Sequence, residues 1–187
     1  MLHFSKKQER TTNCDPKRFI IRSINVDSTS NSDSFTHLIV GGSRGIGRSL
    51  VDQSIHAGQQ VVALSRTDPA EQPSGCEWIT GDAGKPDEFI EQLPEKISAL
   101  TFCPGKVILG PIKRLKPEQM LEAYQTSVLD AFTLVQSVLP RLDGSVVFIS
   151  SVAASAGLPN HCAISAAKSG LEGFALALSA GLAPNSG

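Results

Sequence analysis

The chain has 187 residues, of which 41% are hydrophobic and 19% charged, and its formal net charge is -1. This size and composition allow one buried core, and the near-neutral charge excludes the strong field that draws basic proteins to nucleic acid or anionic membranes. The four cysteines and four histidines lack the spacing of a zinc site or a disulfide framework. No apolar run approaches the roughly 20 residues that span a bilayer, and no secretory signal begins the chain. We therefore expect a cytoplasmic protein without a metal site.

Residues 1–34 are polar, and their only apolar patch is Phe19, Ile20 and Ile21. Such a segment cannot bury enough apolar surface to offset the entropy lost on ordering, which predicts a disordered tail. Organellar targeting by this tail is the alternative, because basic and hydroxyl residues are frequent in it, although Glu9 and Asp15 are unusual in transit peptides. We assign residues 35–187 to one domain.

From residue 35 the sequence alternates between short apolar runs and helical periodicity. The apolar runs predict buried parallel strands at 37–40, 61–64, 78–80, 100–103 and 146–149. Apolar residues at helical spacing predict helices over 46–55, over 120–139, where Pro140 ends the helix, and over 161–182. This alternation is typical of an α/β fold, and we expect a Rossmann doubly wound parallel sheet of about five strands.

A glycine-rich turn lies between the first predicted strand and the first predicted helix. It contains Gly41, Ser43, Arg44, Gly45, Ile46 and Gly47. Glycine lets phosphate oxygens approach the backbone, and the free N–H groups at a helix start donate hydrogen bonds to them. A turn that only packs the helix against the sheet is the alternative, but its place between strand and helix favours a dinucleotide pyrophosphate site.

The pattern G-x-x-x-G-I-G resembles the phosphate turn of the short-chain dehydrogenases/reductases, with Gly41, Gly45 and Gly47 matching and Val40 in place of the family's threonine. The resemblance covers the chain from about Thr36 to Pro184. It implies the strand order 3-2-1-4-5, a nicotinamide dinucleotide cofactor, and hydride transfer between the nicotinamide and a small carbonyl or alcohol.

The residues near the predicted ribose site favour NADP(H) over NAD(H). An acidic residue about 20 positions after the turn is typical of NAD binding, whereas this chain has Ser65 and Arg66 there, and Arg44 within the turn. Arginine pairs selectively with phosphate, although two solvated surface arginines are the alternative reading. The resemblance further implies adenine contacts at Asp82 and Ala83, and it aligns Cys103, Pro104 and Gly105 with the family's N-A-G turn.

The resemblance implies an incomplete catalytic set. Ser151 and Lys168 match the family's serine and lysine, but Ile164 replaces the tyrosine that protonates the carbonyl oxygen, and Ser127 replaces an asparagine. Loss of the acid predicts weak or impaired turnover. His161 and Ser165 fall at i and i+4 of the helix that carries Lys168 at i+7, so either is a candidate substitute acid. A structural histidine at the helix start is the alternative.

In the resembling family two further strands follow the last helix. We expect a chain that lacks them and leaves the edge of the 146–149 strand unpaired unless something covers it. The helices at 120–139 and 161–182 correspond to the family's dimer-forming pair, which suggests a homo-oligomer, although burial in the core is the alternative. The readings that stay open are a weak oxidoreductase, a catalytically silent NADP(H)-binding or assembly module, and a truncated inactive fragment.

Overall fold

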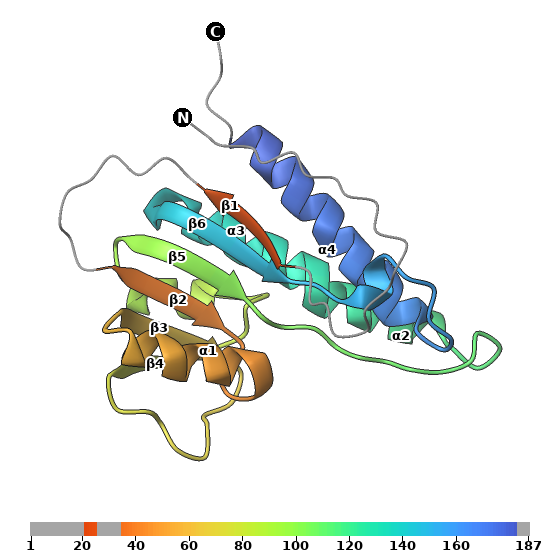
Figure 1. Cartoon of the computed structure of the whole chain (residues 1–187), viewed down its shortest axis with the longest axis horizontal. Helices are drawn as coiled ribbons and strands as arrows, with labels where there is room; N and C mark the ends of the chain where they lie inside the picture. Colours follow the sequence, from red (N-terminus) through yellow and green to blue (C-terminus); the bar gives the residue numbers. More distant parts are fainter. Residues whose placement is uncertain (1–20, 26–34, 183–187) are drawn as a thin grey trace, which may run out of the picture.

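A central parallel sheet organises the molecule, for which the computed structural model describes residues 21–25 and 35–182. Five strands pair in parallel in the order β6-β5-β2-β3-β4. Their bounds are Thr36–Val40 (β2), Gln60–Ser65 (β3), Cys76–Thr80 (β4), Ile97–Phe102 (β5) and Leu142–Ile149 (β6). This is the expected order 3-2-1-4-5, and the predicted Rossmann fold is confirmed (Figure 1).

Helices cover both faces of this sheet. They are α1 (Gly45–His56), α2 (Pro117–Tyr124), α3 (Asp130–Val138) and α4 (Cys162–Gly181), with short 3-10 turns at Pro86–Glu88, Ile90–Gln92, Leu139–Arg141 and Val152–Ala154. The helix predicted over 120–139 differs from the observed one in its middle, where the π-helical turn η3 (Gln125–Leu129) joins α2 to α3. Such turns insert one extra residue and rotate the side chains that follow.

Successive side chains along the strands point to opposite faces of the sheet and so form two hydrophobic clusters. Leu38 and Val40 of β2 belong to the large cluster that also contains apolar residues of α3 and α4. Ile39, between them, packs on the other side with Val51 of α1. Because successive strand side chains point to opposite faces, each buried strand needs a helical layer on both sides. The doubly wound arrangement follows from this requirement.

An antiparallel strand from the N-terminal segment covers the outer edge of the sheet, which corrects two expectations. Residues Ile21–Asn25 form β1 and pair with β6, Ile21 opposite Ile149 and Asn25 opposite Ser145. The polar tail is therefore not disordered at these five residues, and the last parallel strand is not left unpaired (Figure 1). The physical reason is that the free N–H and C=O groups along the β6 edge need partners. Residues 1–20 and 26–34 lie outside the described part of the chain.

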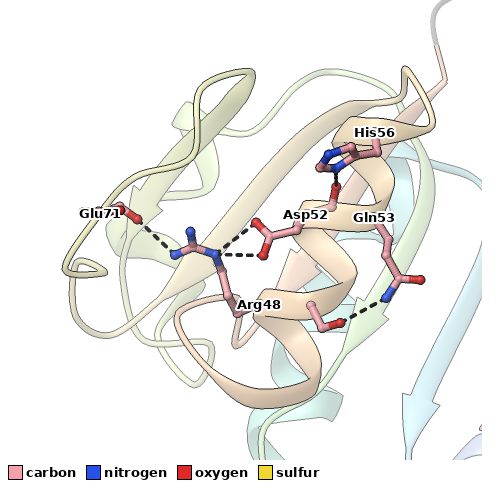
Figure 2. Close-up of polar contacts among 6 residues, drawn as sticks. Arg48, Asp52, Gln53, His56 and Glu71 are labelled. Carbon is pink, nitrogen blue, oxygen red and sulfur yellow. Dashed lines mark hydrogen bonds and ion pairs between the residues drawn. The ribbon is translucent and has the colours of Figure 1, made fainter.

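Contacts from α1 hold the loop between β3 and β4. Arg48 donates from Nε to Asp52 at 3.1 Å and from Nη1 to the carbonyl oxygen of Glu71 at 3.0 Å. Figure 2 shows the Arg48 guanidinium between α1 and this loop, with His56 and Gln53 bonded within the helix. The loop begins at Arg66, so these bonds fix the course of the chain that leaves the end of β3.

Two features of residues 21–25 and 35–182 bear on the class of function. No helix there is long and apolar enough to cross a bilayer. No group of three or more His, Cys, Asp or Glu side chains in the same residues could hold a metal ion. The compartment expected from composition stays a prediction.

His37 is a buried polar residue on β2. Its ring lies between Ser54 of α1, at 3.2 Å from Nδ1, and Thr101 of β5, at 2.8 Å from Nε2. Only 8% of the residue is exposed, and burial lowers the pKa of this imidazole below its usual 6.5, while a hydrogen bond with Gln59 opposes the shift. The folded protein therefore favours the neutral ring.

We predict that His37 makes the fold less stable in acid. Because its folded pKa lies below the unfolded value, its contribution is complete above pH 6.5 and is lost as the pH falls below that value. Urea unfolding between pH 7.5 and 5 should show this loss, with a slope of at most about 1.4 kcal/mol per pH unit from this one group. A His37→Gln variant should show a shallower slope than the wild type. Equal slopes for the two proteins would contradict the prediction.

Candidate functional site

The turn between β2 and α1 is shaped by glycines at three points. Gly41 and Gly45 have φ of +81° and +59°, a region that other residues rarely adopt. A Cβ on Gly47 would lie 2.2 Å from the carbonyl oxygen of Gly41, so only glycine allows α1 to start this close to β2. No side chain caps the start of α1 at Arg44. The first N–H groups of the helix are thus left for a ligand, and the helix dipole favours an anionic one.

A pocket of about 440 Å³ opens from this turn across the carboxyl ends of the parallel strands. In doubly wound sheets ligands bind at this edge, next to the point where the strand order reverses, which here lies between β2 and β5. The lining residues are Val40, Gly41, Ser43, Arg44, Ile46, Gly47, Leu64, Ser65, Arg66, Thr67, Gly81, Asp82, Ala83, Cys103, Pro104, Gly105, Thr126 and Asp130.

This pocket brings together nearly all the residues proposed from the sequence to contact a cofactor. Of that set, only Gly45 and Lys168 are absent from the lining. Sequence reasoning missed Thr126 and Asp130, which approach from the helical layer. The signal was their spacing of four residues, which places both on one helix face beside Ser127, a position the family resemblance had already marked.

Two arginines stand at the rim of the pocket. Arg44 precedes α1 and Arg66 follows β3, both are exposed, and neither forms an ion pair with another described residue. Ser65 beside them is buried and donates from Oγ to the carbonyl oxygen of Thr67 at 2.6 Å. The guanidinium groups are therefore available to an anionic group of a ligand, while the Ser65 hydroxyl hydrogen is engaged within the loop.

Lys168 reaches the floor of the site from α4. Its ammonium donates to the carbonyl oxygens of Ile149 at 2.8 Å and Pro104 at 3.1 Å, and only 5% of the residue is exposed. Burial lowers its pKa to about 8, an effect that the nearby Cys103 opposes. Burial also raises the pKa of the Cys103 thiol to about 11, so this cysteine stays protonated and unreactive near neutral pH.

A glycine lets the Lys168 ammonium approach the backbone closely at the pocket wall. A Cβ on Gly105 would lie 2.8 Å from Lys168 Nζ and 3.6 Å from Ser127 Oγ. Ser127 is fully buried, and its hydroxyl has no hydrogen-bond partner among the described residues. The position that aligns with the family's asparagine therefore presents an unpaired hydroxyl to the same corner that Lys168 occupies.

The other proposed catalytic positions do not line the pocket, and their polar side chains make backbone contacts. Ser151 accepts from the N–H of Ala153 at 3.2 Å, and Ser165 donates to the carbonyl oxygen of Ala153 at 2.6 Å. His161 sits before the first turn of α4 and donates from Nδ1 to the carbonyl oxygen of Pro159 at 2.6 Å. Ile164 is buried, with 3% of the residue exposed. Neither candidate substitute acid, His161 or Ser165, is among the residues that line the pocket.

Comparisons with known proteins point to one family. The model of the short chain dehydrogenase family matches residues 36–186. The chain is 29% identical over 159 residues to carbonyl reductase family member 4 of Danio rerio, covering 75% of this chain and 66% of that protein. It is 28% identical over 162 residues to a 3-oxoacyl-(acyl-carrier-protein) reductase of Haemophilus influenzae, covering 75% of this chain and 65% of that enzyme. The chain thus spans slightly less than two thirds of the length of these relatives.

A solved structure supports the fold independently. A short-chain dehydrogenase/reductase from Burkholderia multivorans, solved with bound NADP, superposes with a TM-score of 0.71 at 18% identity. The superposition covers 81% of this chain and 74% of that one. At this identity the likeness shows the shared fold alone.

The residues present fit a nicotinamide dinucleotide. Gly47 lets α1 begin directly against the Gly41 carbonyl, and the uncapped N–H groups at the start of α1 lie at this turn. The pocket continues from there to the ends of β3 and β4, where an adenosine half has room, and to Cys103 and Gly105 at the end of β5. The start of α1 can thus bind an anionic group, and the pocket extends from it towards the ends of β3 and β4 and towards the end of β5.

We predict that Gly47→Ala weakens nicotinamide coenzyme binding. The added methyl group would overlap the Gly41 carbonyl oxygen and force α1 away from β2, which displaces the amide donors. Titration calorimetry with NADPH should show a loss of affinity of at least tenfold, equivalent to about 1.4 kcal/mol. Gly173→Ala, at a helical site where an added Cβ meets nothing within 4 Å, is the matched control and should bind as the wild type. Unchanged affinity in a folded Gly47→Ala protein would contradict the assignment.

Proposed function

This chain belongs to the short-chain dehydrogenase family, and from that premise we propose that it binds NADP(H) in preference to NAD(H) and acts weakly on a small carbonyl or alcohol. The family comprises oxidoreductases that bind NAD(P) in a Rossmann domain. The observation that carries the proposal is the pocket that joins the glycine turn to Arg44 and Arg66. The amides of the turn would hold the pyrophosphate, and the two guanidinium groups would hold the phosphate that distinguishes NADP(H).

The residues that follow β3 at the pocket wall support this preference, because neither Arg66 nor Thr67 is acidic. Acceptance of a ribose 2'-hydroxyl needs an acidic residue after the second parallel strand, and β3 is instead followed by Arg66 and Thr67 at the pocket wall. Asp68, the next residue, is engaged through its carboxylate with Thr80 at the end of β4. The charge at this strand end therefore suits a phosphate better than a hydroxyl.

We predict that Arg66→Ala reduces the affinity for NADPH and leaves that for NADH unchanged. A hydrogen bond to a charged group contributes about 1.5 to 3 kcal/mol, so the loss should be about tenfold or more. Arg114→Ala removes an exposed arginine outside the pocket and is the matched control. Parallel calorimetric titrations measure both coenzymes. Equal affinity of the wild type for NADPH and NADH would overturn the proposed preference.

When bound, NADP(H) supplies or accepts the hydride, and the chain's own residues determine how well that chemistry proceeds. Lys168 would hold the nicotinamide half, because its ammonium lies close beside Gly105, which lines the pocket. Ser151, at the end of β6, would orient a substrate oxygen. Isoleucine at position 164 cannot donate a proton, so the carbonyl oxygen would lack its usual acid.

A catalytically silent NADP(H)-binding or assembly module is the second candidate. The observation that favours it is the hydrogen bonding of the two substitute acids: Ser165 is bonded to Ala153, and His161 to Pro159. Because neither Ser165 nor His161 lines the pocket, a protein that binds the coenzyme without turning over a substrate is consistent with these contacts. A truncated inactive fragment, the third alternative, differs from both because it would not bind the coenzyme.

We predict that Ile164→Tyr raises NADPH-dependent reduction of a carbonyl panel by a factor of about 10² to 10⁴, the usual contribution of a general acid. Ile164→Phe adds the same ring without the hydroxyl and should stay at the wild-type rate. Stopped-flow absorbance of NADPH measures all three proteins. If wild type already turns over as fast as Ile164→Tyr, the native site has another acid and the proposed impairment is wrong.

Self-association is the proposed partnership, alongside a small-molecule substrate and without nucleic acid. Exposed apolar side chains gather on the helices at 120–139 and 161–182, among them Leu121, Phe132 and Leu176, which are 62%, 46% and 53% exposed. Burying them against a second copy would remove this apolar surface from water. Light scattering should therefore show a homo-oligomer, and a monomer at high concentration would contradict it.

A further inference from the structure

Asp130 is a pocket residue that the proposed coenzyme contacts do not use. It begins α3, lines the pocket, and is only 9% exposed. A Cβ on Gly84 would lie 2.7 Å from its Oδ1 and 3.6 Å from Oδ1 of Asp82, which follows β4. The two carboxylates therefore border the same small space, which the glycine leaves open.

The π-helical turn sets the direction of this side chain. The N–H of Asp130 donates to the carbonyl oxygen of Gln125, five residues earlier, and the extra residue in this turn places Asp130 and Thr126 together at the pocket wall. Gln125 also donates from its side chain to Asp130 Oδ1 at 2.8 Å. The second oxygen, Oδ2, accepts no hydrogen bond from residues 21–25 or 35–182.

One oxygen of this carboxylate is open to a ligand. Oδ2 is not among the buried side-chain atoms that lack a partner, so it is accessible from the pocket that Asp130 lines. Burial of the residue raises the pKa of the carboxyl group and the neighbouring Asp82 adds to the rise, while the Gln125 hydrogen bond and Arg66 oppose it. The pocket wall thus offers a hydrogen-bond acceptor beside the end of β4.

We propose that Asp130 is a specificity-determining residue that, beside Asp82, recognises the base of the bound dinucleotide by accepting a hydrogen bond from the exocyclic amino group of adenine. The inference rests on the proposed function, because it assigns the adenine half of the same coenzyme to this end of the pocket. The amino group is the one strong donor that adenine presents on its edge. Hypoxanthine carries a carbonyl oxygen at that position, which would face two carboxylates.

The charges along the pocket agree with this assignment. The glycine turn and Arg44 provide the positive end for the phosphates, and Asp82 and Asp130 provide acceptors at the ends of β4 and α3. Oδ1 of Asp82 accepts from the N–H of Gly84 at 3.0 Å and Oδ1 of Asp130 accepts from Gln125, so Oδ2 of each carboxylate accepts no hydrogen bond from the described residues. A purely structural Asp130 would stabilise the π-turn through Gln125 but would not distinguish one base from another.

The test is a calorimetric comparison, on the full chain, of NADPH with its deamino analogue, reduced nicotinamide hypoxanthine dinucleotide phosphate. Wild type should bind NADPH at least tenfold more tightly, the factor expected for one hydrogen bond to a charged group. In Asp130→Asn the ratio should fall towards one, because the asparagine amide can donate to the hypoxanthine oxygen and keep its contact with Gln125. Asp87→Asn, an exposed carboxylate outside the pocket, is the matched control and should keep the wild-type ratio.

Each outcome decides between separate claims. If wild type binds both dinucleotides equally, or if a folded Asp130→Asn keeps the full ratio, the assignment of Asp130 is overturned while coenzyme binding stands. If wild type binds neither dinucleotide, the proposed function itself fails and the inference falls with it. Thermal melting checks that Asp130→Asn is folded, and Asp130→Ser is a second variant if it is not. The ratio of the two dinucleotide affinities in the wild type can be measured even if both variants fail to fold.

Discussion

The approach of α1 to β2 is the constraint on which the site depends. Gly47 packs so closely on the carbonyl oxygen of Gly41 that no larger residue fits, and Gly41 and Gly45 adopt backbone angles that other residues avoid. This contact places the uncapped start of a twelve-residue helix directly over the carboxyl end of a central strand. Every other feature of the pocket is arranged around these amide donors.

The polar groups of the pocket divide it into regions of different chemistry. Arg44 and Arg66 are exposed at the rim, the carboxylates of Asp82 and Asp130 lie at the ends of β4 and α3, and Lys168 lies buried under Gly105. The loop that carries Arg66 is held to α1 by Arg48 (Figure 2). The part of the pocket proposed to hold the cofactor therefore carries both cationic and hydrogen-bonding groups. The proposed reacting end, in contrast, has a buried isoleucine at position 164 and a hydroxyl at Ser127 without a partner among the described residues.

The parallel sheet could be predicted from sequence because its strands contain short apolar runs that alternate with helical periodicity, and a glycine pattern marks the first crossover. β1 could not, since Ile21–Asn25 is mostly polar and forms through backbone pairing with β6, which leaves no periodic signal. The π-turn was missed for a similar reason: one extra residue in a helix does not disturb an apolar pattern enough to be read. Asp130 was therefore not among the residues proposed from the sequence, although the turn directs it into the pocket.

The most direct measurement of the central claim is amide hydrogen exchange of the full chain with and without saturating NADPH. The account predicts slower exchange at residues 41–47 and at the residues that follow β3 and β4, because these amides and loops would hold the dinucleotide. Absence of NADPH uptake, or protection confined to other parts of the chain, would contradict it.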